Sequence, residues 1–122
     1  MKLLYYLSLL QGIFYVFTGV WPLIHLDSFV GVTGPKTDIW LVKTVGVLVL
    51  AIGVALISAR KNPQLPIVLL AINSALGLAA IDIVYVFDGT ISWIYLTDAI
   101  IEILLVIAWL SGYLLSMKTV YQ

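Results

Sequence analysis

The sequence predicts an all-α integral membrane protein, a bundle of four transmembrane helices with both termini on the same side of the membrane. Hydrophobic residues make up 63% of the 122 residues, charged residues only 10%, and the mean hydropathy is +1.17. Soluble domains are closer to half apolar and a quarter charged. Four apolar stretches recur along the chain, and each is long enough to cross the hydrocarbon core of a bilayer. This length predicts a single membrane domain over residues 1–122.

The composition also excludes several classes of function. Six basic and six acidic residues cancel, so the chain has no basic surface for nucleic acid. Cysteine is absent, which removes disulfides, thiolate nucleophiles and cysteine-ligated iron–sulfur clusters. The single histidine, His25, excludes bis-histidine haem ligation within one chain. No nucleophile elbow, P-loop, zinc pattern or dinucleotide fingerprint occurs, so we expect no cofactor and no metal.

The first apolar run predicts a spanning helix over residues 3–24. It is too long for a typical signal-peptide core and lacks a small-residue cleavage site. Gln11, Thr18 and His25 recur every seven residues and predict a mildly polar stripe that faces other helices. Four aromatic residues of this span either line a lipid or quinone cleft, or lie in the core or against lipid: Tyr5, Tyr6, Tyr15 and Phe17.

The connection over residues 25–38 is polar enough to leave the membrane, and the second span follows over residues 39–58. Small residues on one face of this span predict a seam where a neighbouring backbone approaches closely. The alternative is that its glycines only reflect the higher use of glycine in membrane helices. The residues that share this face are Lys43, Gly46, Leu50 and Gly53.

Basic residues predict the orientation of the chain. A short turn separates the second span from the third, residues 66–87, and the turn at Asp88 and Gly89 precedes the fourth, residues 94–115. With four spans, both termini share a side with the first of these turns, so the positive-inside rule places the termini in the cytoplasm. This side carries Lys2, Arg60, Lys61 and Lys118, whereas the other side has only Lys36 outside the spans.

Ionisable residues inside the apolar stretches predict a polar centre. Asp98 and Glu102 are four residues apart, which puts both carboxylates on one helical face. Counted at about 1.5 Å per residue, Lys43, Asp82, Asp98 and Glu102 all lie within roughly 6–12 Å of the same membrane surface. His25, at the exit of the first span, caps this group. We therefore expect these five residues to form one buried polar cluster, a candidate binding site with no catalytic residue assigned.

Three interpretations of this cluster are open, because one lysine faces three carboxylates. A carboxyl group holds a proton, or else His25, Lys36 or a bound cation supplies the missing positive charge. The cluster either fixes helix register as an ion-paired layer, handles a proton or ligand, or binds a divalent metal. A metal is the least favoured, since Lys43 competes for the same carboxylates. For His25 alone, a hydrogen-bonding role at the interface is favoured over a ligand role.

Three segments resemble stretches of small, uncharacterised bacterial four-helix membrane proteins, and the overall plan is similar to the DoxX-like group. The segments are residues 32–38 (VTGPKTD), 40–46 (WLVKTVG) and 95–102 (YLTDAIIE). The resemblance implies a multi-pass protein of the bacterial inner membrane. Some DoxX-related proteins are linked to quinone-coupled sulfur oxidation or act as partners of redox enzymes. The absence of cysteine and of cofactor motifs argues against a redox activity of this chain itself.

Three functions are consistent with the sequence. The first, which small size, short loops and absent catalytic motifs favour, is a non-catalytic accessory or partner-binding subunit of a membrane complex. The second is a proton- or cation-linked binding or transport module that uses Asp82, Asp98 and Glu102. The third is a membrane enzyme that moves a proton on an apolar substrate through a buried carboxylate pair. Expected partners are membrane lipid and either a membrane protein or a second copy, and no nucleic acid.

Overall fold

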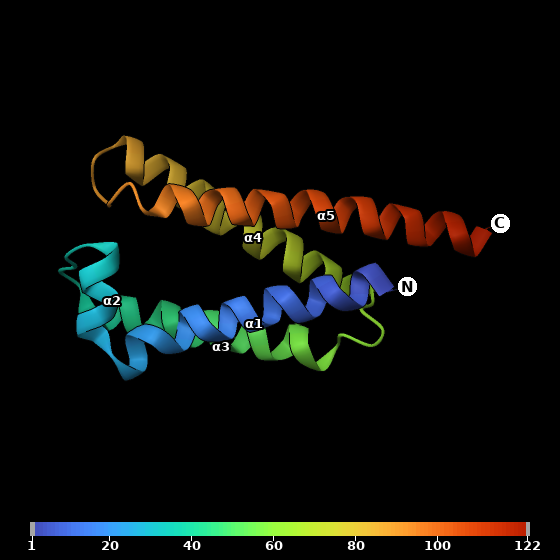
Figure 1. Cartoon of the computed structure of the whole chain (residues 1–122), viewed down its shortest axis with the longest axis horizontal. Coiled ribbons are helices and arrows are strands. Elements are labelled where there is room, and N and C mark those ends of the chain that lie inside the picture. Colours follow the sequence, from blue (N-terminus) through green and yellow to red (C-terminus); the bar gives the residue numbers. More distant parts are fainter. Residues whose placement is uncertain (1, 122) are drawn as a thin grey trace.

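The computed structural model describes residues 2–121, and the side chains of residues 2–118. This part of the chain is helical, contains no strand, and has four helices long and apolar enough to cross a membrane. The predicted all-α class and the four apolar spans are therefore confirmed. The helices in Figure 1 are α1 (Lys2–Ile24), α2 (Leu26–Thr33), α3 (Ile39–Ser58), α4 (Leu65–Phe87) and α5 (Tyr95–Tyr121).

Two predicted boundaries need correction. The connection over residues 25–38 contains the short helix α2, whose first turn is capped because the backbone N–H of Ser28 donates to Nδ1 of His25 at 3.2 Å. The fourth span begins at Tyr95 and continues to Tyr121, beyond the predicted end at residue 115. No proline or turn residue interrupts that extension, so the helical backbone continues past the apolar stretch.

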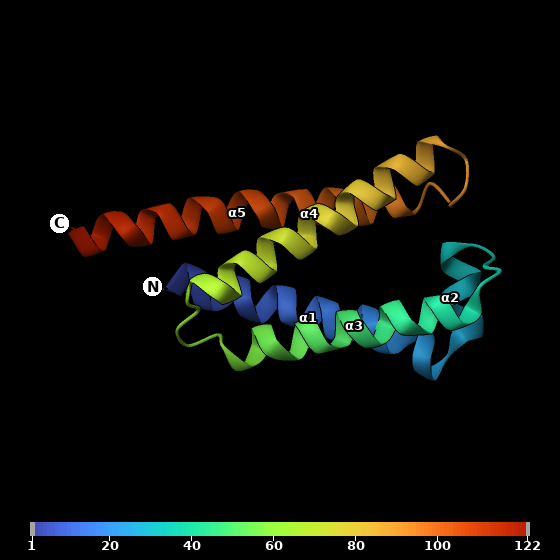
Figure 2. The ribbon, with the colours of Figure 1, turned by 180° about the vertical axis from the view of Figure 1, so that it is seen from behind.

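The four long helices pack as two antiparallel pairs, α1 with α3 and α4 with α5. Contacts between the pairs are fewer, and they run from α1 to α5 and from α3 to α4. Figures 1 and 2 show the beginning of α4 crossing close to the first turns of α1, whereas the two pairs separate toward α2. The first turn of α1 and the last turns of α5 lie at the same end of the structure.

Reciprocal glycine pairs bring the backbones of α1 and α3 together. A Cβ atom added at Gly12 would lie 2.9 Å from the carbonyl oxygen of Gly53, and one added at Gly53 would lie 2.7 Å from that of Gly12. Seven residues away along each helix, Gly19 and Gly46 repeat the arrangement at 2.6 and 2.7 Å. The predicted close approach is thus confirmed at Gly46 and Gly53, and their partners on α1 complete the seam.

The hydrophobic core draws side chains from all four long helices, at the end where the two pairs lie close together. Small alanine side chains on α4 allow this approach, and Trp109 of α5 fills the largest share of the space. The buried cluster consists of Leu4, Leu7, Tyr15, Leu56, Val68, Ala71 and Trp109.

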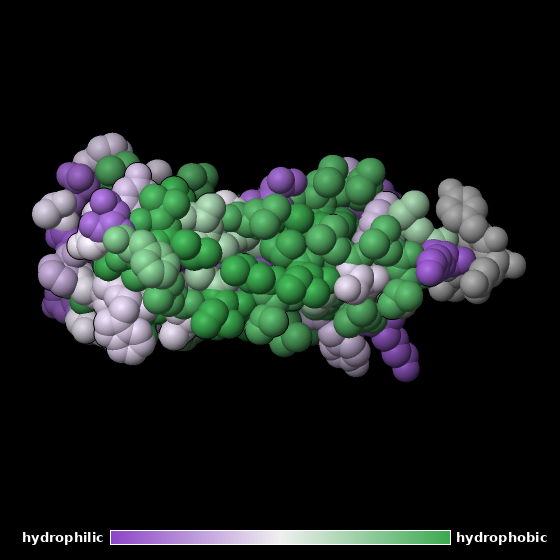
Figure 3. Space-filling model, turned by 90° about the horizontal axis from the view of Figure 1, so that it is seen from above, coloured by the Kyte–Doolittle hydropathy of each residue, from purple (hydrophilic) through white to green (hydrophobic). Residues whose placement is uncertain are grey.

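The outer surface separates into an apolar middle and polar ends. Figure 3 shows a continuous hydrophobic band between the hydrophilic end that carries α2 and the opposite end, where Lys118 lies. Large apolar side chains are exposed within this band, such as Leu104 at 61% and Leu48 at 58%. Such a band is consistent with the hydrocarbon core of a bilayer, which it could cross.

The glycine seam generates a stability prediction. Replacing Gly53 with Val should lower the free energy of unfolding by about 1–3 kcal/mol, because the new side chain meets the backbone of α1 and forces the helices apart. Reversible unfolding of the purified protein in detergent micelles measures the change. Gly31→Ala in α2 is the control, since a Cβ there meets nothing within 4 Å. Equal stability of the two variants would contradict this account of the seam.

Candidate functional site

The structure brings three of the predicted site residues together between α4 and α5. Asp82 of α4 is 6% exposed and Glu102 of α5 is 1% exposed, while Asp98 is partly buried. The charges of Asp98 and Glu102 both act on the Asp82 carboxyl group. Asp98 and Glu102 share one face of α5, as predicted. Both carboxyl groups are therefore close enough to Asp82 of α4 to interact with it electrostatically.

Asp82 is the least satisfied polar group of this cluster. Its Oδ2 atom is buried and has no hydrogen-bond partner among the described residues. A buried acceptor without a donor typically costs about 1–3 kcal/mol. The side chain beside it, Asp98, is another carboxyl group, and two ionised carboxylates offer each other no donor. A proton on one of the two carboxyl groups can supply the missing hydrogen bond, as can a donor from water or from another bound molecule.

Glu102 connects the carboxyl cluster to the other helix pair. The hydroxyl of Tyr15 on α1 donates to Oε2 of Glu102 at 2.7 Å, and Tyr15 is only 1% exposed. From the sequence, Tyr15 could line a cleft, or lie in the core or against lipid. The available signal was its spacing of four residues from Gln11, which places both side chains on one face of α1.

Tyr15 belongs to a polar ridge on α1 that consists of Ser8, Gln11 and Tyr15. Ser8 Oγ donates to the carbonyl oxygen of Leu56 in α3 at 2.5 Å. Gln11 Nε2 donates to the carbonyl oxygen of Ala71 in α4 at 3.1 Å, and its Oε1 accepts from the Trp109 indole N–H of α5 at 2.6 Å. The ridge thus bonds α1 to each of the other three long helices.

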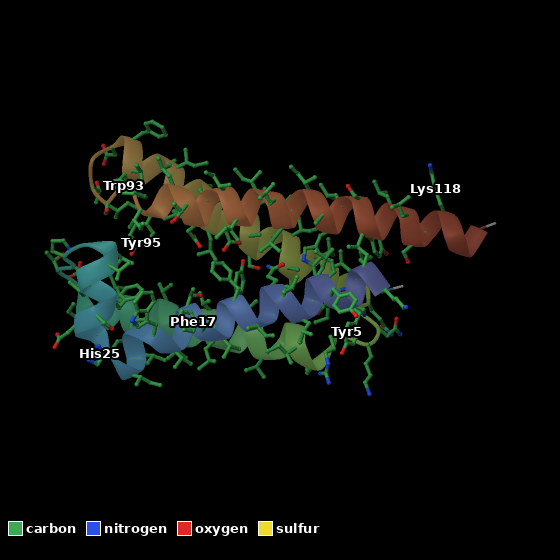
Figure 4. All side chains as sticks on the ribbon, in the orientation of Figure 1. Tyr5, Phe17, His25, Trp93, Tyr95 and Lys118 are labelled. Carbon is green, nitrogen blue, oxygen red and sulfur yellow. The ribbon has the colours of Figure 1, made fainter. Side chains whose placement is uncertain are left out.

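Of the three residues of the predicted stripe, Gln11, Thr18 and His25, only Gln11 forms side-chain hydrogen bonds to other long helices. Thr18 bonds within its own helix, since its hydroxyl donates to the carbonyl oxygen of Phe14 at 2.9 Å. His25 is exposed at the end of α1, where it caps α2 (Figure 4). A step of seven residues moves only about 20° around a helix, so Thr18 lies on nearly the same face as Gln11. It is further along α1, toward the end where the two helix pairs separate, and His25 follows the last residue of the helix.

Lys43 and His25 do not join the three carboxyl groups. Lys43 is exposed on α3, and no described acidic side chain forms an ion pair with a basic one. The expected ion-paired layer is therefore not formed. The physical reason is the packing: α3 pairs with α1, and the two helix pairs separate at the end where Lys43 and the carboxyl groups lie.

Lys36 is also engaged elsewhere. Its ammonium donates to the carbonyl oxygen of Gly34 at 2.8 Å and lies 5.1 Å from the ring centroid of Tyr95 and 5.7 Å from that of Phe29. This contact joins the segment after α2 to the beginning of α5, where Figure 4 shows Tyr95 between the two elements. The positive charge of Lys36 is thus used at the polar end of the molecule.

Two other features bear on the chemistry of this region. In the described part of the chain, no three His, Asp or Glu side chains are arranged to hold a metal ion. An open apolar groove of about 560 Å³ runs along α1, lined by Phe17 and Trp21 with Ile57 of α3. Phe17 thus lines a groove, as one prediction had it, but none of the three carboxyl groups does.

Comparisons with known proteins add no relative to this description. No family model matches the chain, no curated protein matches its sequence, and no solved structure matches its fold.

The bond between the two helix pairs generates a second prediction. Replacing Tyr15 with Phe should lower the free energy of unfolding by about 1 kcal/mol, because Glu102 loses its donor. Unfolding in detergent micelles measures this loss. Tyr6→Phe is the control, since Tyr6 lies on the same helix and is 55% exposed. In a Glu102→Ala background, Tyr15→Phe should cost clearly less, and an equal cost in both backgrounds would contradict the coupling.

Proposed function

We propose that this chain is a multi-pass membrane protein that binds and releases a proton at the Asp82–Asp98 pair and serves as a proton-linked binding or transport module. The observation that carries the proposal is the buried Oδ2 atom of Asp82, which lacks a donor while it lies beside a second carboxyl group. Two carboxylates at close range in an apolar setting repel each other. One shared proton removes that repulsion and supplies the missing hydrogen bond.

The surroundings of the pair support a proton over other positive charges. Lys36 and Lys43 do not pair with an acid among the described side chains, and His25 is exposed at the far end of α1. A metal ion finds no set of three suitable ligands in the described residues. A proton needs no coordination shell, so two adjacent carboxyl groups are sufficient for it.

Glu102 supports coupling between this proton and the arrangement of the helices. The charge on Asp98 acts on Glu102, whose Oε2 atom accepts the bond from Tyr15 of the other helix pair. Loss of a proton from the Asp82–Asp98 pair adds negative charge next to Glu102. The added charge changes the strength of a contact that joins the two pairs, so proton binding shifts the balance between their relative positions.

The orientation and origin of the protein complete this proposal. Lys2, Arg60, Lys61 and Lys118 support cytoplasmic termini by the positive-inside rule, with the carboxyl pair closer to the opposite surface. The bacterial inner membrane follows only from the resemblance to DoxX-like proteins. The accessory-subunit and enzyme functions stay predictions, and the groove along α1 does not bring an apolar substrate to Glu102.

Infrared difference spectroscopy of the protein in lipid nanodiscs, between acid and alkaline pH, tests the proposal. The wild type should lose the C=O band of a protonated carboxyl as pH rises, and Asp82→Asn and Asp98→Asn should each lack the change assigned to the pair. Asp88→Asn is the matched control, because Asp88 is an exposed carboxyl in the turn after α4 and should leave the buried signal intact. Identical difference spectra for the wild type and the two pair variants would overturn the proposal.

A further inference from the structure

The outer face of α4 carries a regularly spaced stripe of five residues, three of which are small or polar. Leu70, Asn73, Gly77, Ala80 and Val84 are spaced by three, four, three and four residues, and all except the partly buried Leu70 are exposed. The stripe lies opposite the alanines that α4 buries against the rest of the chain. This spacing keeps the five positions on one side of the helix and is the pattern by which helices pair at small crossing angles.

Asn73 is the polar member of this stripe and lies deep in the apolar band. It is eight residues from the beginning of α4, so at about 1.5 Å per residue it lies roughly 12 Å into a hydrocarbon core about 30 Å thick. Its amide nitrogen donates to the carbonyl oxygen of Leu69 in the same helix at 2.8 Å. Its side-chain oxygen has no donor among the described residues, and lipid tails cannot provide one.

Gly77 has no role in packing within the chain. A Cβ atom added there meets nothing within 4 Å, whereas at Gly12, Gly19, Gly46 or Gly53 it would collide with the neighbouring helix. The chain thus uses glycine elsewhere to bring helix backbones into contact. Gly77, one turn from Asn73, exposes a similar patch of backbone, but no other described helix packs against it.

We propose that this stripe is the interface of a parallel homodimer in which α4 packs against α4 of a second copy. Two copies of the chain inserted in the same orientation have their Asn73 side chains at the same depth in the membrane. A two-fold axis between the two α4 helices then brings these side chains into contact. The carboxamide is both donor and acceptor, so it is complementary to itself. Gly77 and Ala80 allow the backbones to approach. Asp82 faces the interior of its own chain, so this inference is independent of the proposed proton site.

Disulfide formation in the membrane gives the first test, since the chain has no cysteine of its own. Ala80→Cys should produce covalent dimers under mild oxidation. Val47→Cys on α3 is the matched control, because Val47 is 52% exposed at nearly the same depth but lies on another helix. Leu104→Cys on α5, 61% exposed, is a second control. Dimers from Ala80→Cys alone support the interface, and equal yields from all three positions overturn it.

Dilution of fluorescently labelled protein in lipid bilayers, with dimers counted by single-molecule photobleaching, gives the second test. Asn73→Leu and Gly77→Leu should each weaken dimerisation roughly 10-fold. Both variants should keep wild-type helicity and stability as monomers, because neither side chain meets another helix of its own chain. Unchanged dimerisation in both variants, or a wild type that is monomeric at every dilution, would overturn the proposal.

Discussion

The polar ridge of α1 is the constraint on which the rest of this fold depends. Contacts between the two helix pairs are few, and lipid gives the pairs no hydrophobic reason to associate. Gln11 and Tyr15 supply that reason, because their buried groups find partners on α4 and α5 and would otherwise face hydrocarbon, while Ser8 bonds to α3 within its own pair. The ridge also determines which residues of the other helices become interior, including Trp109 and Glu102.

Contacts within a helix pair differ in kind from contacts between the pairs. Within the pair of α1 and α3, glycines bring backbone against backbone, and this packing resists change because a shift of one helix collides with the other. Between the pairs, side chains make the contact, through the hydrogen bonds of Gln11 and Tyr15 and the packing of Trp109 in the core. Glu102 takes part in one of these contacts, so the carboxyl cluster is connected directly to the interface between the pairs.

The sequence predicted the class, the four spans and the inward position of Asp82, Asp98 and Glu102, because apolar length and helical spacing are local properties. It did not predict that Lys43 stays apart, since that depends on which helices pair and where the pairs diverge. Tyr15 was missed as a partner of Glu102 for a related reason. An aromatic residue in an apolar span has the same pattern whether it faces lipid or a buried acceptor, and only the neighbouring Gln11 marked the interior face.

The uneven spacing of the helix pairs has a mechanical consequence. The pairs are bonded near the first turns of α1, whereas near α2 they are joined through Lys36 and the ring of Tyr95. Any relative tilt about the bonded end moves the end near α2 furthest. A tilt of this kind would change the area that the protein occupies more in one leaflet than in the other, so its free energy would depend on the lateral pressure within the bilayer.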